Sequence, residues 1–373
     1  MREAVFYEIV DDDKVCCHVC GHGCIIPEGR TGLCGVRYNK GNTLYALNYG
    51  KAISAAVDPI EKKPLYHFLP GTESLSVATV GCNFRCAFCQ NDDISQYPKN
   101  KNHDIPGFDL APEEIVQKAL DNGCKSVSYT YTEPTIFIEY AHDTAKLAHL
   151  HGLKNIFVSN GYMSRETIDY IFPYLDAINI DLKSFSEEFY HKLCGAHLEK
   201  VLENIKLFHE LGVWMEITTL VIPTENDSRE NFEKIAKFIS EIDTEIPWHI
   251  SRFYPAYRMN DLPPTSFEKL KEAYQIAKKS GLKNVYIGNY PTHDFESSYC
   301  PSCEEIIIER ESFRIKNKLQ KNICKKCGEK IAGIFEGQIF FLLKNKNVTS
   351  DLRFTDNVIQ EVLLSIEKLL LIY

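Results

Sequence analysis

The chain has 373 residues, of which 44% are hydrophobic and 25% are charged, as expected for a globular protein with one large domain and smaller additions. Its formal net charge of −9 argues against general binding to nucleic acids, which depends on clustered Lys and Arg. The sequence has no apolar signal core and no apolar run of the ~18 residues that a membrane span needs, so we expect a cytoplasmic protein without membrane contact.

The first predicted segment, residues 1–66, is rich in cysteine. The chain has 14 cysteines and no export signal, and the cytosol keeps thiols reduced, so metal ligation explains them better than disulfides do. A set of four lies close together here and predicts a closed metal site: Cys17, Cys20, Cys24 and Cys34. Cys16, His18 and His22 are spare ligands, so the sequence leaves open both the ligand set and the choice between zinc and an auxiliary iron–sulfur cluster.

The second predicted segment, residues 67–293, alternates short β-rich runs with amphipathic stretches, which is the pattern of parallel βα units. The expected strands are 75–80, 126–131, 155–159, 177–181, 214–221, 248–253 and 284–287, and the expected helices are 112–121, 135–149, 165–172, 201–211, 228–242 and 266–279. Polar residues follow several strands, as in a TIM-like barrel, whose active site lies at the C-terminal ends of its strands. We therefore predict an α/β fold with a partial (β/α)6-type barrel, although a doubly wound open sheet would give the same alternation.

Three cysteines, Cys82, Cys86 and Cys89, follow the first of these strands without another Cys or His nearby until His103. Zinc sites usually show two pairs of ligands, and iron–sulfur clusters are normally held by four cysteines. A loop with three would leave one iron of a [4Fe-4S] cluster open to a small molecule, just as an open coordination position marks a catalytic metal site. The loop therefore predicts a catalytic cluster.

Polar residues at the ends of the second and third strands are candidates for ligand binding. Glu133 precedes Pro134, so its carboxylate is presented at the strand end; the alternative is that it caps the helix that follows. Ser159 and Asn160 end the third strand, where a hydroxyl and an amide can reach a ribose, although Asn160-Gly161 is also a turn signal.

The fourth and sixth strands supply charged candidates. Asp181 and Lys183 alternate at a strand end, so they point to one face and can pair over the barrel mouth, or form a purely structural ion pair. His249 and Arg252 lie three residues apart on one strand, so only one of them can face the barrel interior.

The last two predicted segments are residues 294–345 and 346–373. The first has a doubled CxxC pattern typical of a zinc ribbon, which favours zinc over an auxiliary iron–sulfur cluster: Cys300, Cys303, Cys324 and Cys327. The second has apolar residues at helical spacing and is predicted to be a helix packed on the body of the protein.

Together these motifs resemble the radical S-adenosylmethionine (SAM) enzymes of the AmmeMemoRadiSam system, which are relatives of the pyruvate formate-lyase activating enzymes. The resemblance rests on the two outer cysteine sets, the CxxxCxxC loop with Phe88 before its last cysteine, Tyr131-Thr132-Glu133-Pro134, Asp181-Leu182-Lys183 and Pro247-Trp248-His249. It implies a [4Fe-4S] cluster on Cys82, Cys86 and Cys89 whose open iron binds SAM. One electron from the cluster then splits SAM into methionine and a 5′-deoxyadenosyl radical.

The same resemblance implies a role for each candidate residue. Contact with SAM is implied for Phe88, Tyr131, Thr132, Glu133, Ser159 and Asn160, and a place beside SAM and substrate is implied for the catalytic candidates Asp181, Lys183 and His249. This chain has Tyr131-Thr132 where the related enzymes often have two glycines. The implied partners are a reductant such as a flavodoxin or ferredoxin, and a protein substrate or partner proteins of a shared pathway.

We therefore expect an enzyme that abstracts hydrogen from either a protein glycine, as glycyl-radical activating enzymes do, or a small molecule or nucleotide. The competing hypothesis is a non-catalytic, metal-stabilised binding module for RNA or protein. The net charge of −9 and the three-cysteine loop both disfavour that hypothesis.

Overall fold

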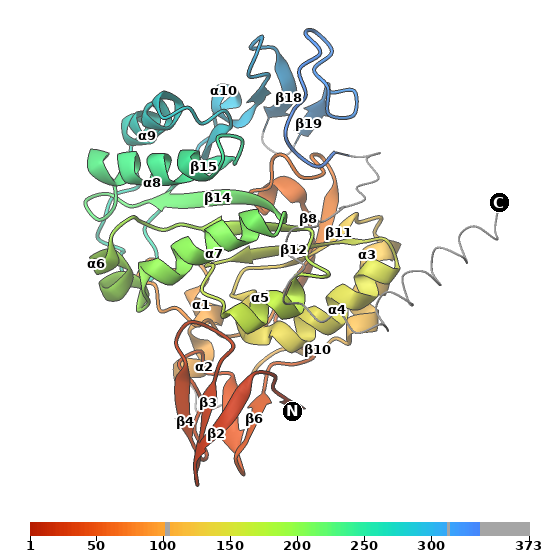
Figure 1. The fold of residues 1–373 in the computed structure, drawn as a ribbon, viewed down its shortest axis with the longest axis vertical. Coiled ribbons are helices and arrows are strands. Elements are labelled where there is room, and N and C mark those ends of the chain that lie inside the picture. The colour runs from red at the N-terminus through yellow and green to blue at the C-terminus, as the bar shows by residue number, and fades with distance from the viewer. Residues whose placement is uncertain (101–104, 312–313, 336–373) are drawn as a thin grey trace, which may run out of the picture. The chain divides into compact units, whose positions relative to one another are not determined.

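The computed structural model describes residues 1–100, 105–311 and 314–335, all of them within the unit Met1–Gly337 (Figure 1). The predicted helix over 346–373 lies outside the described residues. In this described part of the chain, no helix has the length and apolar character that a membrane span needs.

The centre of the fold is an eight-stranded sheet, whose strand order is β16-β15-β14-β13-β12-β11-β9-β8. Strands β9 to β16 of this sheet run parallel, and β8 (Ser54–Pro59) pairs antiparallel with β9 at one edge. The parallel strands are β9 (Glu73–Ala78), β11 (Ser126–Tyr129), β12 (Lys154–Ser159), β13 (Ala177–Asp181), β14 (Trp214–Val221), β15 (Trp248–Arg252) and β16 (Val285–Gly288). All of the expected strands are therefore confirmed, whereas β8 was not predicted.

The order of the parallel strands decides between the two predicted architectures. A doubly wound sheet reverses its strand order at a switch point, whereas here each strand lies beside the next one in the chain from β9 to β16. Sequential βα units that keep one direction of winding build a TIM-like barrel or part of one. The partial barrel prediction is confirmed, and the strand ends that follow Ala78, Tyr129, Ser159 and Asp181 come together at one end of the sheet.

Helices follow the strands as the sequence predicts. They are α3 (Pro112–Asp121), α4 (Ile138–Leu150, preceded by the 3-10 turn η2, Pro134–Phe137), α5 (Arg165–Ile171), α7 (Leu198–Glu210), α8 (Arg229–Ile242) and α9 (Phe267–Lys279). Serine caps begin three of them: the hydroxyls of Ser164, Ser228 and Ser266 accept from backbone N–H groups in the first turn, which are otherwise unpaired. Figure 1 shows α5 and α7 in front of the sheet.

The cysteine-rich N-terminal segment forms two small antiparallel sheets. One contains β2 (Tyr7–Asp11), β3 (Lys14–Cys17) and β4 (Cys24–Pro27), and the other contains β1 (Arg2–Glu3), β6 (Thr43–Ala46) and β5 (Arg37–Lys40). Further along, β7 (Lys51–Ala52) pairs with β10 (Phe108–Asp109), so the segment is joined to the region between β9 and α3.

A buried ion pair fastens this segment to the barrel. Arg37 donates to the Glu139 carboxylate through both terminal nitrogens, at 2.5 and 2.8 Å, and both side chains are buried. The backbone N–H of Val5 also donates to Glu139, at 2.8 Å. A bidentate pair of this kind is held in one geometry and leaves an uncompensated charge when either partner is lost.

We therefore expect Glu139→Ala to lower the free energy of unfolding by about 3–5 kcal/mol, the usual cost of breaking a buried pair from one side. Urea unfolding under reducing, anaerobic conditions would measure the change. Asp169→Ala, which removes an exposed i,i+4 pair with Arg165, is the control and should shift the midpoint little. Equal shifts for the two variants would show that the buried pair has no special role.

The C-terminal segment contains α10 (His293–Glu296), β17 (Ser298–Tyr299), β18 (Ile306–Glu311) and β19 (Arg314–Asn317). Its buried Arg310 donates to the Tyr66 carbonyl oxygen at 2.6 Å, and its guanidinium lies 4.1 Å from the centroid of the Tyr66 ring. His67 hydrogen-bonds to the Ala332 carbonyl oxygen at 2.8 Å. The segment is thereby tied to the chain between β8 and β9.

Candidate active site

The three-cysteine loop follows β9 directly and is fastened to a π-helix, η3 (Tyr190–Cys194). The backbone N–H groups of Arg85 and Ala87 donate to the carbonyls of Cys194 and Leu193, both at 2.9 Å. π-Helical turns are rare and frequently occur at functional sites. The shape of the loop is thus set partly by an element that the sequence did not predict.

The three thiols lie in a largely buried setting. The backbone N–H of Phe84 donates to Cys82 Sγ at 3.4 Å, and Ser95 Oγ lies 3.2 Å from Cys89 Sγ. Burial raises the pKa of Cys82 and of Cys89, and a hydrogen bond with the neighbouring Cys194 thiol, followed by burial, raises the pKa of Cys86. Only thiolates ligate metals, so these sulfurs need a strongly positive partner, and the irons of a cluster provide one.

At least one pair of the three loop sulfurs lies more than 4.8 Å apart. Within the described residues, the groups of potential ligands whose atoms all lie within 4.8 Å of one another do not include Cys82, Cys86 and Cys89. A tetrahedral zinc ion with Zn–S bonds of about 2.3 Å would hold its sulfurs ~3.8 Å apart. A cubane cluster places several metal atoms between its ligands and needs wider spacing.

Glu133 joins the ends of the second and third parallel strands. Its carboxylate accepts from Ser159 Oγ at 2.8 Å, from the Asn160 N–H at 2.8 Å and from the Thr135 N–H at 3.1 Å. Burial raises the pKa of Glu133, while these donors act in the opposite direction. Glu133 therefore caps η2, as the alternative prediction stated. It also contacts Ser159 and Asn160, the two other predicted cofactor residues at these strand ends.

Asn160 connects this group to the cysteine loop. Its side-chain amide donates to Asn83 Oδ1 at 2.7 Å and lies 4.0 Å from Cys82 Sγ. Both asparagines are buried. The first cysteine of the loop therefore lies beside the ends of the second and third strands, where the resemblance to radical SAM enzymes requires the cofactor.

The predicted pair of Asp181 and Lys183 is present and lies near the second cysteine. Lys183 Nζ donates to Asp181 Oδ2 at 2.8 Å and lies 5.9 Å from the centroid of the Phe88 ring. Burial disfavours the Lys183 ammonium, but the nearby Asp181 carboxylate and Cys86 raise its pKa well above the usual value. Asp181, Lys183 and Phe88 thus form a group on the Cys86 side of the loop.

Tyr131 and Thr132 hold the second strand end to its neighbours. Tyr131 has a positive φ of 65°, and its carbonyl oxygen accepts from the Asn91 amide at 2.9 Å, just after the cysteine loop. The Tyr131 hydroxyl donates to Asp58, and Thr132 Oγ1 donates to the Thr79 carbonyl oxygen at 2.8 Å. Their side chains therefore bind protein groups, and the backbone of this turn is what faces the loop.

His249 is surrounded by a different set of residues. It hydrogen-bonds to Glu216 Oε2 at 2.7 Å, and its ring lies 4.7 Å from Tyr66 and 5.3 Å from Tyr286. Glu216 also accepts from the backbone N–H groups of Tyr66 and His67. In the described part of the chain, these contacts join His249 to the segment between β8 and β9 rather than to the cysteine loop.

Three residues that the sequence analysis did not single out lie at the site. Cys194 is fully buried beside Cys86, Asn83 links Asn160 to the loop, and Lys99 Nζ donates to the Phe84 carbonyl oxygen at 2.6 Å. Asn83 could have been suspected from its place directly after the first cysteine. Cys194 is distant in sequence, and Lys99 lies in the helix α2 (Tyr97–Asn100), which is too short to show a period, so only the fold brings them here.

The sulfurs of the C-terminal cysteines lie close together. The four ligand atoms of Cys300, Cys303, Cys324 and Cys327 all lie within 4.8 Å of one another. Cys300 Sγ is 3.5 Å from Cys327 Sγ, and Cys303 Sγ is 3.8 Å from Cys324 Sγ. These separations match the ~3.8 Å expected around a single zinc ion.

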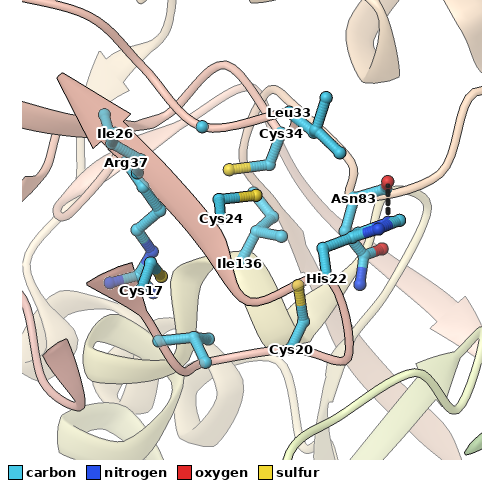
Figure 2. A pocket seen from close by; sticks show the side chains of 12 residues that line it. Cys17, Cys20, His22, Cys24, Ile26, Leu33, Cys34, Arg37, Asn83 and Ile136 are labelled. Carbon is cyan, nitrogen blue, oxygen red and sulfur yellow. Dashed lines mark hydrogen bonds between the residues drawn. The ribbon is translucent and has the colours of Figure 1, made fainter. Parts of the chain in front are cut away.

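The N-terminal cysteines line one pocket beside the cysteine loop. Figure 2 shows Cys17, Cys20, Cys24 and Cys34 around this pocket, with Arg37, His22 and Asn83 on its walls. Cys16 is not among the lining residues and instead lies with Glu8 and His18 in a separate group. The structure thus places the predicted four together and separates the spare thiol from them.

Comparison with known proteins identifies the class to which this fold and site belong. Residues 76–239, which contain the cysteine loop and the strand ends around it, match the radical SAM superfamily. These residues therefore form a radical SAM domain.

The chain is also similar to individual proteins. The chain is 48% identical over 335 residues to the uncharacterized protein MJ0808 of Methanocaldococcus jannaschii, covering 89% of this chain and 99% of that protein. It is 24% identical over 216 residues to the pyruvate formate-lyase-activating enzyme of Clostridium pasteurianum, covering 53% and 87% of the two chains. A radical SAM methyltransferase from Sphaerobacter thermophilus aligns with a TM-score of 0.47 and 16% identity, over 59% of this chain and 67% of that one.

Substitution of Glu133 can separate its two candidate roles, which are SAM binding and capping of η2. If the carboxylate accepts from the amino group of SAM, Glu133→Ala should weaken SAM binding about tenfold to a hundredfold, because a hydrogen bond to a charged group contributes roughly 1.5–3 kcal/mol. Anaerobic equilibrium dialysis with SAM would measure this, with iron content as the check that the cluster is intact. The matched variant Glu133→Gln keeps the size of the side chain and removes its charge. Lower stability with unchanged SAM affinity in both variants would leave only the capping role.

Proposed function

We propose that this protein is a radical SAM enzyme whose Cys82, Cys86 and Cys89 hold a [4Fe-4S] cluster. When bound, that cluster supplies the electron that splits SAM into methionine and a 5′-deoxyadenosyl radical, which abstracts hydrogen from the substrate. The observation that carries the proposal is the chain of contacts from Cys82 through Asn160 to Glu133, which joins the loop to two strand ends.

The other residues of the site bind and orient SAM and the substrate. Glu133, Ser159 and Asn160 bind and orient SAM through its amino group and ribose, and the backbone at Tyr131 and Thr132 shapes the same wall. Asp181 and Lys183 form a charged pair beside Cys86 that contacts SAM or substrate. Glu133, Ser159 and Asn160 are buried, and their burial keeps water from that side of the place where a reactive radical would form.

For His249 we propose a positioning role. Its ring is held by Glu216 and packs on Tyr66, so it supports the segment between β8 and β9, and through it the inner wall of the barrel. The narrower assignment to the AmmeMemoRadiSam system family is also part of the proposal, supported by the motifs in the sequence and by the N-terminal and C-terminal cysteine sets.

The substrate is either a protein glycine or a small molecule or nucleotide. The similarity to the pyruvate formate-lyase-activating enzyme of Clostridium pasteurianum supports the first class. The electron would come from a low-potential carrier such as a flavodoxin or ferredoxin.

Incubation of the anaerobically purified protein with SAM and a chemical reductant tests the proposal, with 5′-deoxyadenosine measured by mass spectrometry. We expect a brown protein that forms 5′-deoxyadenosine. A colourless protein with zinc but neither iron nor sulfide would instead favour the metal-stabilised binding module.

A further inference from the structure

The pocket formed by the N-terminal cysteines differs from the C-terminal cysteine site in its geometry. Within the described residues, the groups whose ligand atoms all lie within 4.8 Å include the four C-terminal cysteines but no three of Cys17, Cys20, Cys24 and Cys34. These four nevertheless line a single pocket (Figure 2). Among any three of these cysteines, at least one pair of sulfurs is therefore more than 4.8 Å apart, which is wider than the ~3.8 Å between sulfurs around one zinc ion.

Two buried hydrogen-bond donors line this pocket without a partner. Arg37 uses both terminal nitrogens on Glu139, and its Nε, also buried, has no acceptor. Asn83 accepts from Asn160 through Oδ1, and its buried Nδ2 has no acceptor either. An unpaired buried donor costs about 1–3 kcal/mol, so such groups in a native protein call for an acceptor.

Both donors suit the sulfurs of a cluster. Thiolate and sulfide sulfurs of iron–sulfur centres accept hydrogen bonds, and those bonds help to set the properties of the cluster. A single zinc ion offers only its four thiolates, whereas a cubane cluster adds inorganic sulfides that would lie nearer to donors on the pocket wall.

The pocket also touches the catalytic loop directly. His22 Nε2 hydrogen-bonds to the carbonyl oxygen of Asn83, at 2.9 Å, and Asn83 is the residue after Cys82. Gly81 has a φ of +99°, and a Cβ at that position would lie 2.9 Å from the Cys34 carbonyl oxygen. The N-terminal set is therefore packed against the residues on either side of the first cysteine of the loop.

We propose that Cys17, Cys20, Cys24 and Cys34 hold a second iron–sulfur cluster, of the closed [4Fe-4S] type, which receives hydrogen bonds from Arg37 Nε and Asn83 Nδ2. The C-terminal cysteines by contrast hold zinc. This inference rests on the proposed function in one respect. The measured iron content of the protein is the sum of the iron in the catalytic cluster and the iron in the second cluster.

The test is the metal content of the full chain after anaerobic reconstitution with ferrous iron, sulfide and zinc. We expect about eight iron and eight sulfide atoms per chain, because each [4Fe-4S] cluster contributes four of each. The double variant Cys20→Ser, Cys24→Ser should keep about four irons and its zinc. The matched control Cys16→Ala removes the neighbouring thiol that does not line the pocket and should keep the wild-type content.

The triple variant Cys82→Ala, Cys86→Ala, Cys89→Ala tests the second cluster without altering its ligands, so misfolding of the N-terminal segment does not confuse the result. It should retain about four irons. Wild-type protein with about four irons and two zincs, or a triple variant free of iron, would overturn the inference while leaving the proposed function intact. If the triple variant kept all the wild-type iron, the proposed function would fail instead.

Discussion

Replacement of Cys82, Cys86 or Cys89 by alanine is expected to abolish the formation of 5′-deoxyadenosine. In the proposed function each thiolate holds one iron of the cluster, and removal of one would leave two irons without a protein ligand, so the reactive cluster should be lost. The effect should be complete for each single variant. Anaerobic assays with SAM and reductant would measure it, and zinc at the C-terminal site should be unaffected.

Cys124→Ala is the matched control for this experiment. Cys124 is also a buried thiol, but it lies just before β11, at the start of a strand rather than at its end. Its loss should leave both iron content and SAM cleavage near wild-type values. Full activity in any of the three loop variants would show that the loop does not hold the cluster.

The position of Cys194 beside Cys86 makes a further comparison informative. A closed cluster with four cysteines would need Cys194 as a ligand, whereas an open iron requires that it is not one. Cys194→Ala should therefore retain its iron. Loss of iron in this variant would mean that the cluster is closed and could not bind SAM through an open position.

The second large effect is expected at the C-terminal cysteines. Structural zinc contributes about 10–16 kcal/mol to the folding of zinc-finger peptides, and the sulfurs of Cys300, Cys303, Cys324 and Cys327 are already spaced for one ion. The double variant Cys324→Ser, Cys327→Ser should therefore unfold this segment locally. Hydrogen exchange measured by mass spectrometry should accelerate over residues 299–311 and 314–333, while SAM cleavage with a chemical reductant persists.

Two outcomes would contradict the zinc assignment. If iron were lost together with zinc, the site would be an auxiliary cluster. If exchange protection persisted but turnover fell, the segment would take part in binding the substrate. Ser302→Ala, within the same turn but not a ligand, is the control for effects of substitution alone.

The barrel could be predicted from the sequence because its signals are local. Strand β13 (Ala177–Asp181) and strand β14 (Trp214–Val221) lie at the predicted bounds, since each is a continuous β-rich run that ends at a polar residue or a proline signal. The clustering of polar residues after the strands was also predictable, because parallel strands bring their C-terminal ends to one edge. This placed Glu133, Ser159 and Asn160 together correctly.

The neighbours of His249 could not be predicted in the same way. The alternation of a strand indicates which face a side chain takes, but not which segment covers that face. Here the chain between β8 and β9 brings Tyr66 to the His249 ring, and Glu216 accepts from His249 and from the Tyr66 backbone. The sequence contained no periodic signal for that segment.

The short strands of the N-terminal segment and the π-helix η3 were missed for a related reason. Strands such as β3 (Lys14–Cys17) and β4 (Cys24–Pro27) are too short for a hydrophobic period to stand out, and their glycine-rich connections resemble loops. A π-helix is favoured by tertiary contacts rather than by composition.

The contact of Arg310 with Tyr66 has a consequence for folding during synthesis. The two residues are 244 positions apart, and His67 and Ala332 are 265 apart. Synthesis at about 5–20 residues per second separates the emergence of these partners by on the order of ten seconds or more. During that time the Tyr66 carbonyl and the His67 ring are without these final partners, so the stretch between β8 and β9 of a nascent chain would be exposed to proteases and chaperones.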